Sequence, residues 1–391
     1  MRSTWQRRAD PGAARFLRAA SLLAMLGAAA GLAAAGVRRH DVADSVHLQL
    51  AEEPAYASVG RVDSPAALGS GSLLAPQWVL TAAHVVEDAT EVTFTLNTAA
   101  YTAAAWHLHP DWAGAAGSEG DLALIELTTP VWEADPAVLY TASDEVDREA
   151  TIVGYGQSGT GDTGAVPGTS GTKRAGDNVI GGLGSVYNYS DVFVLSDLDD
   201  PRTGGTGKAA ALDREYLGAP GDSGGGWFVD VGGHTYLAAV TSFAFAPTDG
   251  FLNYDYDDVM GATRVSQYAA WIEGYLPPPP TPGDINLDGA VDQADLDVLL
   301  GSFGTAAGMD WGDGDFTDDG AVDDRDLSVL LAHWTASASA EADVVPAPLP
   351  AALLAAGGWA LLRRRPREVS MRAAQSPCAL QASFPPATAG G

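Results

Sequence analysis

Gly221-Asp222-Ser223-Gly224-Gly225-Gly226 places one serine in a run of glycines. A serine hydroxyl is a poor nucleophile until a neighbouring base takes its proton, and that base needs an acidic partner to fix its tautomer. Glycines on both sides let the backbone turn sharply, so the N–H groups of Gly221 and Ser223 can point at one spot. Because two such donors form an oxyanion hole, the segment predicts a nucleophilic serine with its oxyanion hole.

Two other segments supply a histidine and an aspartate. They are Thr81-Ala82-Ala83-His84 and Asp121-Leu122-Ala123-Leu124. With Ser223 they provide the three side-chain types that activate a serine hydroxyl. The order along the chain, His84, then Asp121, then Ser223, resembles that of the chymotrypsin/trypsin-like serine proteases.

Smaller matches extend this resemblance over roughly residues 50–275. They are His109-Pro110-Asp111-Trp112, Gly154-Tyr155-Gly156, Val240-Thr241-Ser242-Phe243 and the closing-helix segment Val265 to Ile272. The resemblance implies that Ser223 attacks a peptide carbonyl, that His84 takes its proton and that Asp121 orients the imidazole. At the head of a buried strand, Asp121 is costly unless it is hydrogen-bonded or paired, which favours this role.

The hydrophobic pattern predicts a mainly β fold. From residue 57 to residue 242, short apolar runs rich in β-branched residues are separated by Gly, Pro, Asn, Asp and Ser, as in all-β barrels and sandwiches. Residues 157–188 are rich in Gly, Ser and Thr, and we expect long surface loops there. With the family resemblance, the pattern implies two six-stranded antiparallel β-barrels, with the three catalytic residues in the cleft between them.

The resemblance also implies which residues form the primary substrate pocket. Leu217 lies six residues before Ser223, where trypsin carries an aspartate, and Ser242, Phe243 and Ala244 resemble the opposite wall. Since no carboxylate stands at the base, we expect a small or medium apolar residue before the scissile bond rather than Lys or Arg.

The N-terminal region predicts export. Arginines in residues 2–18 precede an apolar run over residues 19–35, which is typical of a signal peptide; an uncleaved anchor is the alternative. We place the signal peptide at residues 1–36 and the protease domain at 37–276, although Ala35 is also a suitable cleavage site. By resemblance, the new Val37 ammonium inserts and pairs with Asp222.

Charge and cysteine content exclude other classes. The formal net charge of −29 argues against a nucleic-acid partner, because phosphate binding needs clustered Lys and Arg. The one cysteine, Cys378, allows no intramolecular disulfide.

A calcium-binding module follows a proline-rich linker at residues 277–283. Residues 284–334 contain two copies of one acidic loop, each running into an apolar helix start. EF-hand loops place oxygen ligands at positions 1, 3, 5, 7, 9 and 12, with Gly at 6. The predicted Ca²⁺ ligands are Asp284, Asn286, Asp288, Ala290, Asp292 and Asp295, then Asp315, Thr317, Asp319, Ala321, Asp323 and Asp326. Thr317 is a weaker ligand than Asn286, so the second site should bind less tightly.

Aspartate at position 12 resembles the type I dockerin module, which implies a cohesin-like protein partner. Alternatively, the module only protects the linker through calcium-dependent folding, or the segment is a solvated acidic tail.

The C-terminal region contains a linker at residues 335–344, an apolar and arginine-rich segment at 345–367 and a tail at 368–391. The segment resembles the Pro-Glu-Pro (PEP-CTERM) sorting signals of bacterial exported proteins, which implies transient membrane association.

Together these features predict a secreted or cell-surface serine endopeptidase that acts on proteins or peptides and carries a calcium-binding docking module. The alternative is a non-catalytic extracellular binding protein that uses a protease-like fold as a scaffold.

Overall fold

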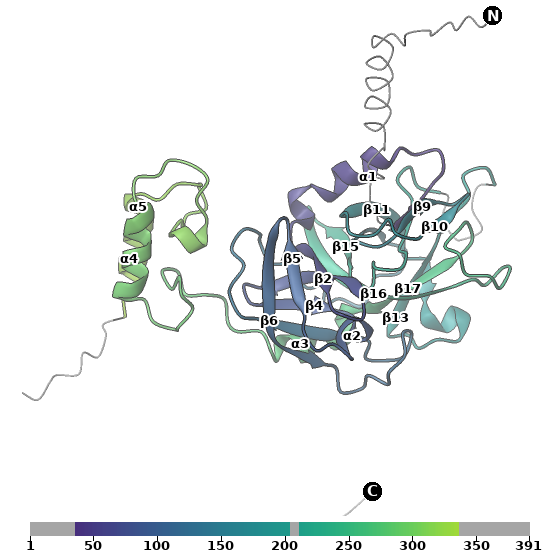
Figure 1. Ribbon diagram of the computed structural model, residues 1–391, viewed down its shortest axis with the longest axis horizontal. Helices are drawn as coiled ribbons and strands as arrows, with labels where there is room; N and C mark the ends of the chain where they lie inside the picture. Colours follow the sequence, from purple (N-terminus) through teal and green to yellow (C-terminus); the bar gives the residue numbers. More distant parts are fainter. Residues whose placement is uncertain (1–35, 204–210, 336–391) are drawn as a thin grey trace, which may run out of the picture. The chain divides into compact units, whose positions relative to one another are not determined.

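The computed structural model describes residues 36–203 and 211–335 (Figure 1). The predicted signal peptide up to residue 35, the linker from residue 336, the sorting-like segment, the tail and Cys378 lie outside these residues. Among the helices that are described, none combines the length and the apolar character that crossing a membrane requires. The described chain is mainly β up to residue 264 and helical in its last part.

The first half of the protease domain is a closed barrel with strand order β2-β3-β4-β7-β6-β5. Its strands are β2 (Val59–Asp63), β3 (Leu68–Ala75), β4 (Trp78–Thr81), β5 (Thr93–Leu96), β6 (Ala99–Leu108) and β7 (Ala123–Leu127). In β5, Phe94 and Leu96 are fully buried while the alternating Thr93 and Thr95 are half-buried, which is the period of two that a barrel wall requires. This half matches the first barrel expected from the sequence.

The second half is an open sheet with seven strands in the order β11-β8-β15-β16-β17-β13-β12. They are β8 (Glu149–Gly154), β11 (Arg174–Val179), β12 (Gly182–Leu183), β13 (Phe193–Asp197), β15 (Gly226–Val231), β16 (His234–Phe245) and β17 (Val259–Arg264). Gly232 and Gly233 join β15 to β16 with φ of 67° and 85°, values that suit a tight hairpin.

A smaller four-stranded sheet has the order β10-β9-β1-β14. It contains β1 (Gly36–Arg38), β9 (Ser158–Thr160), β10 (Gly164–Val166) and β14 (Tyr216–Leu217). Because β14 pairs with β1, and next to β11 there is an isolated bridge between Asp177 and Glu215 rather than a ladder, no ladder among the described strands closes the second half. The sequence predicted a second six-stranded barrel here, and the structure has a half-barrel instead.

The prediction of loops over residues 157–188 is also wrong in part. This segment contains β9, β10, β12, η2 (Gly184–Tyr187) and the largely buried strand β11. Pairing of β11 with β8 overrides its weak strand propensity.

Three helices complete the protease domain: α1 (Asp44–Ala51), α2 (Ala83–Val86) and α3 (Val265–Glu273), together with the short turn η1 (Pro54–Tyr56). Figure 1 shows α1 beside β11, where Asp44 forms a bidentate ion pair with Arg174 at 2.7–2.8 Å. In α3, Val265, Tyr268 and Ile272 are buried at helical spacing, within the segment expected to form the closing helix.

The last described part contains α4 (Gln293–Ser302), η3 (Trp311–Asp313) and α5 (Asp324–Ala332). Each long helix begins with the same capping box, Asp292 with Asp295 in α4 and Asp323 with Asp326 in α5. A small apolar core lies beneath the two helices. It contains Ile285, Val291, Leu299, Val322 and Leu330.

Candidate active site

His84 and Asp121 are brought together by the closed barrel. His84 lies in α2 directly after β4, Asp121 lies directly before β7, and β4 pairs with β7. The Nδ1 atom of His84 is 2.8 Å from Oδ2 and 3.1 Å from Oδ1 of Asp121, and the backbone N–H of His84 also donates to Oδ1 at 3.1 Å. The pairing of β4 with β7 therefore places the side chain that follows β4 in contact with the side chain that precedes β7.

Asp121 is fully buried, so its carboxylate needs compensating donors. Besides His84, it accepts a hydrogen bond from the Ser242 hydroxyl, whose Oγ is 2.5 Å from Oδ2. The backbone N–H of the preceding Gly120 donates to the Tyr268 hydroxyl of α3 at 3.0 Å and holds the loop in place. An ionised Asp121 accepts the Nδ1 proton of His84, which leaves Nε2 as the atom that can accept a proton from a nucleophile.

Ser223 lies in a turn that only glycine neighbours allow. Gly221 and Gly224 have φ of 101° and 84°, in the left-handed region. A Cβ on Gly224 would lie 2.1 Å from the carbonyl oxygen of Ser70 and 2.2 Å from the Thr81 hydroxyl. The closeness of the turn to β3 and β4 therefore requires glycine after the serine.

Ser70, which the sequence analysis did not identify, links the serine turn to the barrel. Its N–H donates to the carbonyl of Ser223 at 2.8 Å, and its hydroxyl donates to the carbonyl of Gly221 at 3.0 Å. The signal available in the sequence was a serine between two glycines. In the structure, Ser70 is fully buried in β3. Ser70 therefore ties the serine turn to strand β3 of the closed barrel.

The predicted oxyanion hole has two unused donors. Within the described part of the chain, the N–H groups of Gly221 and Ser223 donate to no protein acceptor, whereas those of Asp222, Gly224 and Gly225 are all engaged. Free, preorganised N–H groups are what an oxyanion requires.

His84 and Ser223 line one cavity of about 480 Å³, together with Ser242, Phe243 and Ala244. A smaller cavity of about 60 Å³ adjoins Ser223 and shares the last three of these residues. The structure thus brings together the predicted nucleophile, base and one pocket wall.

Leu217 lies elsewhere. It is fully buried in β14, opposite Val37 of β1, and it packs in the core of the second half. The next residues, Gly218 and Ala219, line the small cavity instead. Because the pairing of β14 with β1 turns Leu217 into the core, the assignment of Leu217 to the pocket is corrected here.

Two residues that the sequence analysis missed narrow the small cavity: Tyr254 and Met260. Tyr254 has φ of 64°, and the N–H groups of residues 253–255 donate to Oδ2 of Asp258, which fixes the loop before β17. The Met260 sulfur accepts the N–H of Gly218 at 3.2 Å. None of the described residues that line this cavity carries a charge, and the space left suits a small side chain.

Asp222, beside the nucleophile, points away from the cavity into the protein. Its carboxylate is fully buried and accepts the N–H groups of Gly156 at 2.7 Å, of Ala219 at 2.8 Å and of Gly36. Burial raises the pKa of Asp222 to about 6, while these hydrogen bonds and the charge of Arg174 act to lower it. A Cβ on Gly156 would lie 2.5 Å from Asp222 Oδ2, which explains why the Gly154-Tyr155-Gly156 segment uses glycine there.

The residue whose nitrogen reaches Asp222 is Gly36, one position before the expected Val37. In β1, Val37 pairs with Leu217 and is fully buried, so its backbone belongs to the sheet. Gly36 has φ of 62°, and a Cβ there would lie 1.8 Å from the Tyr216 ring. This register corrects the expected position of the inserted terminus by one residue.

The two acidic loops before α4 and α5 have the same internal hydrogen bonds. Asp284 accepts the N–H of Gly289 at 3.0 Å, and Asp315 accepts that of Gly320 at 2.6 Å. At position 12, fully buried Asp295 accepts N–H groups from residues 285, 286 and 292, and Asp326 does the same in the second loop. Within residues 36–203 and 211–335, no group of three or more His, Cys, Asp or Glu side chains converges to hold a metal. The donor types nevertheless suit Ca²⁺, which prefers carboxylate, amide and carbonyl oxygen.

Comparison with known proteins identifies a family and a similar solved structure. The Trypsin family model matches residues 48–272. Among solved structures, the chain is similar to neuropsin, a serine protease expressed in the limbic system of mouse brain. The two share 19% sequence identity with a TM-score of 0.44, and the match covers 56% of this chain and 95% of neuropsin.

Proposed function

The chain belongs to the trypsin family, and from this we propose that it is a serine endopeptidase in which His84, Asp121 and Ser223 act together. One observation carries the proposal: the imidazole of His84 is hydrogen-bonded to a buried Asp121 and lines the same cavity as Ser223. That geometry supports acyl transfer, because Nε2 is the ring nitrogen left to take the serine proton.

In this mechanism, Ser223 Oγ attacks the carbonyl carbon of the scissile peptide bond while His84 Nε2 accepts its proton. The carbonyl oxygen becomes an oxyanion, which the N–H groups of Gly221 and Ser223 stabilise. His84 then returns the proton to the leaving amine, and Asp121 stabilises the imidazolium between the two transfers. A water molecule repeats the sequence on the acyl-enzyme and restores the serine.

For the substrate, we propose a small apolar residue before the scissile bond. The cavity beside Ser223 is about 60 Å³ in volume, with Tyr254 and Met260 in its walls. An uncharged lining offers no counter-ion to Lys or Arg, so a basic residue there would lose its hydration without compensation.

For activation, we propose that removal of the signal peptide between Ala35 and Gly36 creates the functional N-terminus. The Gly36 nitrogen already bonds to the Asp222 carboxylate, and a free ammonium at this place would pair with it directly. The Ala33-Ala34-Ala35 sequence satisfies the small-x-small rule for signal peptidase. N-terminal sequencing of the secreted protein tests this, and a mature start after Gly36 would overturn it.

For the C-terminal part, we propose calcium-dependent attachment through residues 284–334. The twelve predicted ligands would hold two Ca²⁺ ions, which would neutralise the acidic loops that precede α4 and α5. A cohesin-like protein remains the proposed partner, with protection of the linker as the alternative, and pull-down with and without calcium separates them. Export and transient membrane association through residues 345–367 belong to the same proposal.

A fluorophosphonate probe tests the central proposal, because it labels only an activated serine. We expect labelling of the secreted protein, no labelling of Ser223→Ala, and a loss of kcat by about 10⁶-fold in either Ser223→Ala or His84→Ala. A folded protein that resists the probe would instead favour the non-catalytic scaffold.

A further inference from the structure

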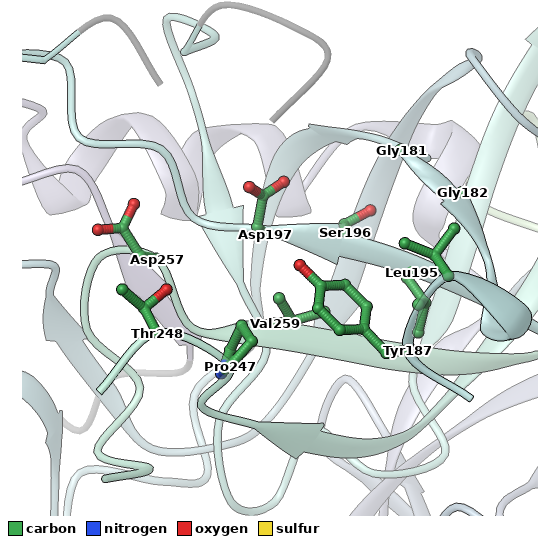
Figure 2. A pocket seen from close by; sticks show the side chains of 11 residues that line it. Gly181, Gly182, Tyr187, Leu195, Ser196, Asp197, Pro247, Thr248, Asp257 and Val259 are labelled. Atoms are coloured by element: carbon green, nitrogen blue, oxygen red, sulfur yellow. The ribbon is translucent and has the colours of Figure 1, made fainter. Parts of the chain in front are cut away.

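A second cavity of about 380 Å³ lies beside the catalytic one and shares no lining residue with it. It is formed where β13 and β17 meet η2 and the loop after β16. Figure 2 shows the ring of Tyr187 on one side and Asp197, Asp257 and Thr248 on the other. The proposed catalytic mechanism makes no use of this cavity.

The lining of this cavity is divided into an apolar part and an acidic part. Val186, Tyr187, Leu195, Pro247 and Val259 supply the apolar walls, and Val186 and Tyr187 are 63% and 41% exposed. Asp197 and Asp257 supply the carboxylates. Burial, followed by the charge of Asp199, raises the pKa of Asp197 to about 6, so an entering cation would relieve an unfavourable environment.

Strand β16 and the loop after it lead from the catalytic cavity, which Ala244 lines, to the second cavity, which Pro247 lines. The strand β15 pairs with β16 only as far as Val240, and β17 pairs with the other edge up to Phe245. The edge of β16 from Ser242 to Phe245 is therefore open to an added strand of substrate. Ser242, Phe243 and Ala244 line the catalytic cavity, so this edge begins at the proposed scissile bond.

Phe245 marks the point where this edge meets the second cavity. Its ring lies 5.1 Å from that of Tyr187, and it pairs across the sheet with Val259, which pairs in turn with Asp197. Paired residues face the same side of a sheet, and neighbouring strands lie about 4.8 Å apart, so Asp197 is roughly 10 Å from Phe245. A substrate strand on the open edge lies one strand spacing beyond Phe245, roughly 14 Å from Asp197, and two residues of extended chain together with one long side chain span about that distance.

We propose that this cavity binds a lysine or arginine side chain of the protein substrate, about four to six residues before the scissile bond. The apolar walls cover the aliphatic stem and the carboxylates receive the charged head, as long basic side chains require. This inference rests on the proposed peptidase function and adds a second specificity site to it. The protease thus reads a small residue at the bond and a basic residue upstream of it.

Internally quenched peptides test the proposal on the full-length secreted protein. One series keeps the residues next to the bond constant and places Lys, Arg, Ala or Glu four, five or six residues before it. A truncated peptide that ends three residues before the bond provides the reference kcat/KM. We expect Lys or Arg to exceed Glu about tenfold at one of these positions.

Two variants test whether the cavity causes the preference for Lys or Arg over Glu. Asp197→Asn should reduce the ratio of Lys to Glu peptides to about one, and Tyr187→Ser, at a largely exposed position, should lower it in the same direction. Glu91→Gln removes one exposed charge elsewhere and should keep the full ratio, which controls for net charge. Thermal melting shows whether each variant is folded.

The outcomes separate the two proposals. If the truncated peptide is cleaved in a Ser223-dependent way but Lys, Arg and Glu peptides are cleaved equally, the second site is wrong and the peptidase function stands. A preference that survives both Asp197→Asn and Tyr187→Ser also overturns the site. If none of the peptides, truncated or longer, is cleaved in a Ser223-dependent way, the peptidase proposal itself fails.

Discussion

The surroundings of Asp121 and Asp222 differ although both carboxylates are fully buried. Asp121, beside the closed barrel, accepts from two side chains, the His84 imidazole and the Ser242 hydroxyl, besides the backbone N–H of His84. Asp222, in the open-sheet half, accepts from the backbone N–H groups of residues 36, 156 and 219. In the proposed mechanism, the first carboxylate therefore controls the protonation of His84, and the second fixes the shape of the turn that carries Ser223.

Replacing Asp121 by Asn tests the chemical role and should have the larger effect. An amide would donate to Nδ1 and stabilise the wrong tautomer of His84, so we expect kcat to fall about 10⁴-fold while the fold is retained. The downfield Nδ1 proton resonance of His84 should disappear as well. Asp88→Asn, an exposed change in the same half, is the control, and equal activity of the two variants would remove Asp121 from the mechanism.

Replacing Asp222 by Asn tests the structural role. The new NH₂ group would face one of the backbone donors, at Gly156 or Ala219, and displace the turn that presents the oxyanion hole. We expect a loss of about 10²–10³-fold in kcat, comparable to losing one oxyanion donor. The Nδ1 proton of His84 should remain visible in this variant. Its disappearance would mean that the two carboxylates share one role.

The pH dependence of stability should reveal whether Gly36 carries a free ammonium. In a chain that retains Ala34 and Ala35, the folded pKa of Asp222 is about 6 against an ordinary value of 3.8. The unfolded state then binds fewer protons between these values, so this group lowers stability as pH rises from 4 to 6, by about 3 kcal/mol. Above pH 6 the difference stays constant.

A chain that begins at Gly36 should lack this decrease, because the ammonium favours the ionised carboxylate. Chemical denaturation of both chains from pH 4 to 8, each with Ser223→Ala to prevent autolysis, measures the contrast. Identical curves would show that the terminus does not pair with Asp222.

Enlarging the small cavity should change specificity more than rate. Met260→Ala removes a side chain from its wall, and Tyr254→Gly also relieves a positive φ of 64°. We expect preference at the residue before the scissile bond to shift from Ala toward Leu or Phe by about tenfold in kcat/KM, since one or two methylenes are worth about 1–3 kcal/mol. Leu217→Ala is the matched control, because Leu217 is buried in β14 and should not alter the preference.

The sequence predicted the contact between His84 and Asp121 better than it predicted the pocket. The contact of His84 with Asp121 depends on the ends of two neighbouring strands, β4 and β7, whose apolar runs are visible in the sequence. The place of Leu217 depends on the pairing of β14 with β1. The partners Val37 and Leu217 are 180 positions apart in the sequence, and no local pattern encodes such a contact. Tyr254 enters the cavity because Asp258 accepts three backbone N–H groups of its loop, which only the folded loop reveals.

The open second half was missed for a related reason. Short strands such as β12 and β14, with two residues each, carry no periodicity that a sequence could show. Closure of a barrel depends on which edges these strands pair with. A count of apolar runs therefore predicts strands but not whether their sheet closes.

The two acidic loops can also be compared with each other, because they share the same internal hydrogen bonds but differ in the residue at position 3. Asn286 accepts the N–H of Asp288 with its side-chain carbonyl at 2.9 Å, and this oxygen can also serve a cation. The Thr317 hydroxyl points to Asp315 Oδ1 at 3.4 Å, and a hydroxyl is the weaker ligand for Ca²⁺. Thr317→Asn should therefore raise the affinity of the second loop about three- to tenfold by calorimetric titration with CaCl₂, and Asn286→Thr should lower that of the first by a similar factor. Equal affinities in all three proteins would mean that position 3 does not contribute a ligand, and the predicted order of the two sites would then be wrong.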